Sequence, residues 1–122
     1  MCYGTYLVKN GKRLFEESPK AWPYGPVFPK VYKTFNQKHM PIVIEREKIP
    51  EFNSDTNALA ICFAVIDKYS HKSAYDLSMW SHKEGTPWYK TVYSETPIVW
   101  NKEIQDDIVK EYFNENPVIQ IN

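Results

Sequence analysis

The chain has 122 residues, which suits one domain with a buried core, and 16% of its residues are aromatic. Fifteen basic residues balance fifteen acidic ones, so the electrostatic footprint of a nucleic-acid-binding protein is missing, and only Arg13 and Arg46 offer guanidinium donors. No membrane-length apolar run and no signal-peptide pattern occurs. We therefore expect a cytoplasmic protein without a membrane partner.

The first third of the chain predicts a helix, a rigid elbow and a second helix. Residues 1–9 are expected to form a helix that ends at the Asn10-Gly11 turn. The segment AWPYGPVFPKVY, residues 21–32, places two aromatic side chains among three prolines and a glycine, which predicts a rigid elbow. A helix over about 27–38 follows, with Pro29 near its first turn.

The middle of the chain predicts an extended segment and a buried helix. Residues 42–44 favour a short strand or extended connector, and residues 45–53 a loop. Ser54 or Asp55 can cap a helix that runs to about Tyr69. Its centre, ALAICFAVI, is apolar on every side, which predicts a central buried helix in which Cys62 is a buried thiol. A disulfide between Cys62 and Cys2 is conceivable, although nothing indicates an oxidising compartment.

Three more helices are predicted after residue 73. Ser73 and Asp76 resemble a capping box that opens a helix over 74–83, and Gly85 is placed to stop it. Thr86 is the expected N-cap of a short helix over 87–93, with proline in its first position. The last helix is expected to be capped by Asn101 and to end at Asn116-Pro117, with Ile104, Ile108 and Tyr112 on one face. The whole pattern predicts a mainly all-α fold, a single compact domain of about five or six helices.

The residues that could carry chemistry do not form a catalytic or metal-binding pattern. The three histidines, His39, His71 and His82, lack metal-ligand spacing, and no nucleophile, phosphate-binding loop or carboxylate dyad is evident. A site built from Cys62 and His82 is conceivable in space only. His82 is better read as a helix-C-terminal cation or a hydrogen-bonding residue at the core edge, and Asp106-Asp107 as a solvated face. We expect no enzymatic activity, no cofactor and no metal.

Two motifs carry a resemblance to a known family. The segment AWPYGPVFPKVY is similar to the signature of the Panacea domain, found in SocA-like antitoxins and phage-associated proteins. Leu77, His82, Pro87 and Trp88 resemble the second motif of that family. The family usually begins with a longer helix than residues 1–8 provide. That difference suggests a truncated start and predicts an apolar groove beside Tyr6 and Leu7, covered by a second copy of the chain or by residues 118–122.

The resemblance implies a non-enzymatic protein-binding module within one domain spanning residues 1–122. Such a module would neutralise a cognate toxin by direct binding, or act as an adaptor that delivers it to a protease system, in a toxin–antitoxin or prophage context. The alternative is a nucleic-acid-binding transcriptional regulator with a helix-turn-helix over 74–93, although Pro87 and Trp88 open its second helix where base-reading residues are wanted. A homo-oligomer is also possible.

The aromatic residues of the two motifs are the predicted partner-binding residues. Trp22 is expected to be buried and to anchor the helix over 27–38, whereas Tyr24 is expected to be partly exposed for partner contact. The full predicted set is Trp22, Tyr24, Pro26, Trp80, His82 and Trp88.

Overall fold

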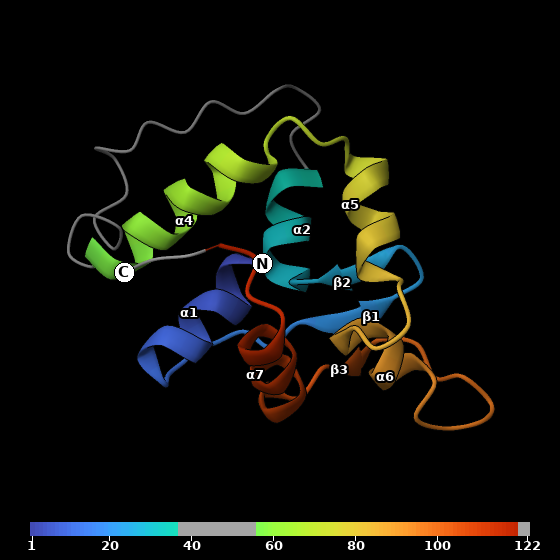
Figure 1. The fold of residues 1–122 in the computed structure, drawn as a ribbon. Helices are drawn as coiled ribbons and strands as arrows, with labels where there is room; N and C mark the ends of the chain where they lie inside the picture. Colours follow the sequence, from blue (N-terminus) through green and yellow to red (C-terminus); the bar gives the residue numbers. More distant parts are fainter. Residues whose placement is uncertain (37–55, 120–122) are drawn as a thin grey trace.

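Six helices and a small three-stranded sheet make up the parts of the chain that the computed structural model describes, residues 1–36 and 56–119 (Figure 1). This arrangement confirms the mainly helical prediction, whereas the extended segment at 42–44 and the caps at Ser54 and Asp55 lie outside the described residues. No helix in the described ranges is long and apolar enough to cross a membrane. In chain order the elements are α1 Cys2–Asn10, β1 Lys20–Trp22, β2 Gly25–Val27, α2 Pro29–Asn36, α4 Thr56–Tyr69, α5 Ala74–Ser81, α6 Pro87–Val92, β3 Lys102–Glu103 and α7 Asp106–Glu115.

The predicted elbow is a β-hairpin. Trp22 of β1 pairs with Gly25 of β2, so that Pro23 and Tyr24 form a two-residue turn, and α2 begins two residues after β2 ends. The strand β3 pairs with the other edge of β1, and the strand order is β2-β1-β3. The sequence analysis missed this sheet because strands of two and three residues are too short to show an alternating pattern.

Helix α1 packs into the core between α4 and α7 (Figure 1). Gly4 allows this approach, because a Cβ atom there would collide with the ring of Phe113 on α7. Tyr6 and Leu7 are buried, with 2% and 5% of their surface exposed. The prediction of an open groove beside them is therefore wrong. Val118, from the segment named as one possible cover, belongs to the same core.

Helix α4 is buried on one face and exposed on the other. Ala58, Ile61 and Val65 lie in the core, but Phe63 is 43% exposed and Ile66 is 53% exposed. The prediction of a helix buried on every side is wrong, because a domain of this size packs only one face of α4. Cys62 is likewise half-buried and not the buried thiol expected.

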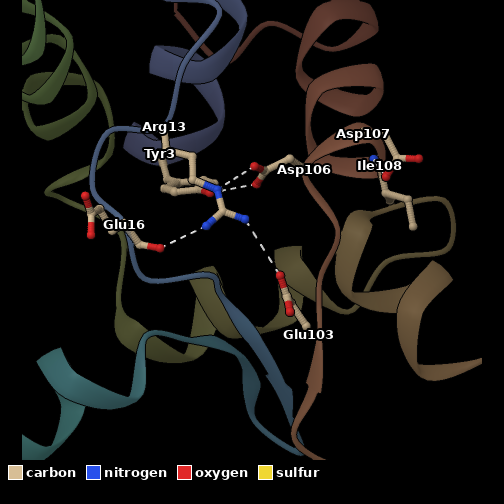
Figure 2. A network of polar contacts seen from close by, with 7 residues as sticks. All are labelled: Tyr3, Arg13, Glu16, Glu103, Asp106, Asp107 and Ile108. Carbon is tan, nitrogen blue, oxygen red and sulfur yellow. Dashed lines mark hydrogen bonds and ion pairs between the residues drawn. The ribbon is translucent and has the colours of Figure 1, made fainter.

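A polar network fixes the start of α7 to α1 and to the segment after it (Figure 2). The hydroxyl of Tyr3 donates to one oxygen of Asp106 at 2.7 Å, and Nε of Arg13 donates to the other at 2.6 Å. Arg13 also donates to the carbonyl oxygen of Glu16 and pairs with Glu103 at 3.7 Å. Burial and the Asp106 hydrogen bond raise the pKa of Tyr3 above its ordinary value. Asp106 is thus a structural acceptor, which corrects the prediction of a solvated face.

The last helix begins later than predicted. Asn101 is not its cap: it has a positive φ of 65° and its backbone N–H donates to the carbonyl oxygen of Ala21 at 2.9 Å. Gln105 holds the N-cap position, and Ile104 is buried just before it, at the end of β3. The buried face of α7 carries Val109 and Phe113. The predicted buried face, Ile104, Ile108 and Tyr112, lies one residue before the observed one. The prediction was wrong because it included Ile104 in the helix.

Candidate functional site: a clamped hairpin turn beside an apolar groove

Three consecutive carbonyl oxygens of the hairpin turn each face a polar side chain from the segment 78–88. Nε1 of Trp88 donates to the carbonyl oxygen of Trp22 at 2.7 Å, and Oγ of Ser78 donates to that of Tyr24 at 2.7 Å. Between them, Nε2 of His82 lies 2.8 Å from the carbonyl oxygen of Pro23. We call these three contacts the turn clamp. The clamp explains why the two sequence motifs occur in one chain: the second motif holds the backbone of the first.

The clamp residues come from two helices whose ends are locally determined. Ser73 caps α5 by accepting the backbone N–H of Asp76 at 3.0 Å, as predicted. Thr86 caps α6 by accepting from Tyr89 at 3.3 Å, with proline in the first helical position, also as predicted. The Thr86 hydroxyl donates to the carbonyl oxygen of Ser81 at 2.7 Å, which ties α6 to the end of α5. Residues 78, 82 and 88 therefore keep a defined spacing toward the hairpin.

Both ring nitrogens of His82 face carbonyl oxygens. Nδ1 lies 2.6 Å from the carbonyl oxygen of Ser78, and Nε2 faces Pro23 as described. A neutral imidazole carries one N–H donor, so only the imidazolium form can donate to both oxygens at once. The ring also contacts Trp88, with 4.0 Å between the ring centroids and 46° between the ring planes. His82 is a hydrogen-bonding residue at the edge of the core, consistent with the structural role that the sequence favours.

Gly25 is required where the hairpin meets α5. Its φ of 127° lies in a region that residues with a Cβ rarely adopt. A Cβ atom there would also lie 2.8 Å from Oγ of Ser81. The close approach places the turn directly against the C-terminal end of α5, below it in Figure 1.

The turn presents one aromatic side chain outward and keeps another half-covered. Tyr24 is 86% exposed, in agreement with the prediction of exposure. Trp22 is half-buried: its ring meets Tyr32 of α2 at 5.1 Å, and its Nε1 donates to Oδ1 of Asn101 at 2.8 Å. Trp22 thus contacts α2 as expected but is not a core residue. Trp88 takes that place, with 5% of its surface exposed.

An apolar groove of about 540 Å³ opens beside the turn, between α4 and α5. We call it the hairpin groove. Its lining contains no Asp, Glu, Lys, Arg or His, and its polar atoms are mainly the hydroxyls of Ser and Tyr side chains. The residues that line it are Met1, Cys2, Tyr24, Pro26, Val65, Ile66, Tyr69, Ser70, Ala74, Leu77, Ser78, Trp80 and Ser81.

A second cavity of about 180 Å³ lies deeper, against the core. It shares Met1, Pro26, Trp80 and Ser81 with the hairpin groove and reaches buried Trp88 and Phe113. Trp80 thus lines both spaces. Loose packing around one indole leaves room for a side chain that enters from the groove.

The structure divides the predicted partner-binding residues into two groups. Tyr24, Pro26 and Trp80 line the hairpin groove, whereas Trp22, His82 and Trp88 do not, and the side chains of these three make polar contacts within the fold. Sequence reasoning missed the helical wall of the groove, formed by residues such as Ile66, Tyr69 and Leu77. The apolar residues on every side of α4 could have indicated this wall. A helix that packs one face on the core is usually polar on its other face, so a second apolar face indicates a further contact surface.

The described residues offer little to hold a metal. In residues 1–36 and 56–119, no group of three or more His, Cys, Asp or Glu side chains is placed to bind an ion. Cys62 and His82, considered together on sequence grounds, lie on different elements, α4 and the C-cap of α5. The side chains of the turn and the groove are mainly aromatic, aliphatic and hydroxyl-bearing.

Comparison with known proteins gives one match. Neither the curated proteins nor the solved structures contain a match to this chain. Residues 2–89 match the family model described as "Antitoxin SocA-like, Panacea domain". The match includes the hairpin, the clamp residues and every residue that lines the hairpin groove except Met1. Because it spans well over half of the chain, the protein belongs to the SocA-like antitoxin family with a Panacea domain.

Proposed function

We propose that this protein is an antitoxin that neutralises a toxin by binding it directly in the hairpin groove, with Tyr24 contacting the toxin at the rim. The turn clamp is the observation that carries the proposal. Three side-chain contacts on successive carbonyls hold a backbone whose outward residue is an exposed tyrosine. A tyrosine side chain that contacts only solvent does not require its backbone to be held by three side-chain contacts. The role requires no chemistry by the chain.

A clamped turn lowers the conformational cost of binding. Ordering a side chain or a loop at an interface costs about 0.5–1.5 kcal/mol for each immobilised side chain. Here the backbone of residues 22–24 is already ordered, and Pro23 restricts it further. Exposed tyrosine and tryptophan are also the residue types that dominate binding energy at interfaces. Tyr24 is therefore a suitable anchor for a partner.

We propose that the occupant of the groove is the apolar face of a toxin helix. The groove runs between two helices, α4 and α5, and an amphipathic helix fits such a groove through apolar residues spaced three and four apart. Pairing of a toxin strand with the sheet is less suitable, because the edge strand β2 contains Pro26, which has no N–H to donate. The absence of charged side chains from the lining favours an uncharged helix face.

The two alternatives have less support. In α6, the second helix of the suggested helix-turn-helix, four of six residues are buried, Pro87, Trp88, Thr91 and Val92. A recognition helix must present its face to a base edge, so α6 is poorly placed to read DNA. Delivery of a bound toxin to a protease remains compatible with the groove, because an adaptor also needs a toxin-binding surface.

Paired charge insertions test the proposal. We would replace Ile66 of the groove and Ile98 of the 94–100 loop separately by glutamate, since both isoleucines are exposed, by 53% and 40%. Each variant is co-expressed with the toxin encoded by the adjacent gene, and growth is measured. Ile66→Glu should lose protection, because a carboxylate in the groove must be desolvated when the toxin helix binds. Ile98→Glu should protect as the wild type does.

Site-specific photo-crosslinking makes the same comparison without perturbing charge. A photoreactive residue at position 66 should crosslink to the toxin, and one at position 98 should not. Full protection by Ile66→Glu, with crosslinks absent at position 66, would show that the toxin binds elsewhere. Circular dichroism of both glutamate variants separates loss of binding from loss of fold.

A further inference from the structure

Two cysteines that are sixty residues apart in the sequence meet in the fold. Cys2 begins α1 and Cys62 lies within α4, and the two helices pack together. The side chains of Cys2 and Cys62 are hydrogen-bonded to each other. Both thiols are free, and both residues are half-buried, so that reagents in solution can reach them. Cys2 also lines the hairpin groove.

The pair is asymmetric in a way that suits oxidation. The hydrogen bond from Cys62 stabilises the thiolate of Cys2 and lowers the pKa of Cys2 to about 6. The same hydrogen bond raises the pKa of Cys62, which keeps its proton. The lowered pKa favours the thiolate form of Cys2, the form that attacks an electrophile, and Cys62 is a neighbouring thiol that can resolve the product.

We propose that Cys2 and Cys62 form an oxidation site at which a hydroperoxide produces an intramolecular disulfide. In the first step the Cys2 sulfur attacks a peroxide oxygen, the O–O bond breaks, an S–O bond forms, and hydroxide leaves. In the second step the Cys62 sulfur attacks the Cys2 sulfenic acid and its proton passes to the departing hydroxide. The hydroxide from the first step takes up the proton that Cys2 released to solvent on forming its thiolate. The two cysteines together lose two electrons, and hydrogen peroxide is reduced to two molecules of water.

The disulfide would join two helices that already pack together and are also linked by a hydrogen bond from Asn57 of α4 to Asn10 of α1. It would close a loop of about sixty residues and so restrict the unfolded chain. Cys2 lies beside Val65 and Ile66 in the lining of the hairpin groove, so the cross-link forms at the wall of the proposed binding surface. The oxidation itself does not depend on the proposed function, because it needs no toxin.

The test treats the purified chain with hydrogen peroxide and measures the intact mass under non-reducing conditions. The wild type should lose the mass of two hydrogens, and digestion should yield one peptide pair linked through Cys2 and Cys62. Dithiothreitol should restore the original mass. The oxidised form should also melt at a higher temperature than the reduced form.

Single serine variants assign the two roles. Cys62→Ser should stop at a sulfenic acid on Cys2 that dimedone labels, because no resolving thiol remains. Cys2→Ser should react more slowly and form no intramolecular disulfide, because burial still raises the pKa of the remaining thiol, Cys62. On the unmodified wild type, iodoacetamide should label Cys2 before Cys62, which checks the asymmetry without any substitution.

Three results would overturn the proposal. One is a wild type that accumulates sulfinic acid on Cys2 without a cross-link. Another is a disulfide found only between two chains. The third is equal peroxide reactivity of the two serine variants. Loss of toxin neutralisation is not a readout here, so failure of this proposal and failure of the proposed function remain distinguishable.

Discussion

The hairpin turn and the loop from residue 94 to 100 both expose apolar side chains, but the fold supports them differently. In the turn, a side chain from α5, α6 or the C-cap of α5 meets the carbonyl oxygen of each residue from 22 to 24. In the loop, the hydrogen bonds lie at its ends: Oγ of Ser94 donates to Thr91, and the backbone N–H of Asn101 donates to Ala21. Figure 1 shows this loop, in orange, extending away from the helices.

The comparison shows that exposed apolar side chains can differ in how firmly the fold holds the backbone that carries them. Val99 and Trp100 are 50% and 45% exposed, but their backbone is held only where the loop begins and ends. Tyr24 is more exposed, at 86%, on a backbone held along its length. Single exposed apolar residues are common in proteins and need no explanation, whereas three side-chain contacts that hold the backbone around one exposed tyrosine do. The turn is therefore the better candidate for a binding surface.

The largest expected effect is the loss of Trp88. Trp88→Ala should destabilise the fold by about 3–5 kcal/mol, because it leaves a cavity in the core and removes the donor to the Trp22 carbonyl. Trp22→Ala, the control, should cost clearly less because Trp22 is only half-buried. Chemical denaturation of both variants measures the difference. Equal losses of stability in the two variants would mean that neither the burial of Trp88 nor its hydrogen bond to the turn adds to the stability of the fold.

Tyr24→Ala should affect binding and not folding. We expect a loss of about 2 kcal/mol or more in toxin affinity, as for an aromatic anchor, with stability unchanged within about 0.5 kcal/mol. Tyr93→Ala removes a tyrosine that is 57% exposed just before the loop, and its affinity should match the wild type. Calorimetric titration with the toxin reports both. If the two variants bind the toxin with equal affinity, Tyr24 is an ordinary exposed tyrosine and the clamped turn is not the binding surface.

Gly25→Ala should have the next largest effect, a loss of stability. An alanine at a φ of 127° is strained by about 1–3 kcal/mol, and its Cβ would press on Oγ of Ser81. Gly85→Ala is the matched control, because Gly85 also has a positive φ, 89°, but open space around it. Thermal melts should show a greater loss at position 25. A greater loss at position 85 would argue against tight contact between the hairpin and α5.

The smallest effect concerns one clamp contact. Ser78→Ala removes the donor to the Tyr24 carbonyl and should cost about 1 kcal/mol of stability. Ser94→Ala, which removes the donor to Thr91, should cost a similar amount. Only Ser78→Ala should also weaken toxin binding, because it loosens the turn that carries Tyr24. If both variants lost toxin affinity to the same extent, the turn would be no more important for toxin binding than the loop.

Some features of the candidate site could be predicted from the sequence and others could not. The exposed Tyr24 was predicted because proline and glycine bracket it in a tight bend, which is a local property. The buried tryptophan was assigned to position 22 instead of 88, because both indoles stand beside a proline and nothing local separates them. Burial was decided by which of them faces the core from α6.

By itself, the sequence determined where several helices begin and end. Gly11 ends α1 in a left-handed conformation, and Ser73 and Thr86 cap α5 and α6, since each device acts within four residues. Only the tertiary structure decided the pairing of β1 with β3, the meeting of Cys2 with Cys62, and the clamp on the turn. These join residues that are between 54 and 83 positions apart, and contacts of such separation depend on how whole elements pack, which no short sequence pattern encodes.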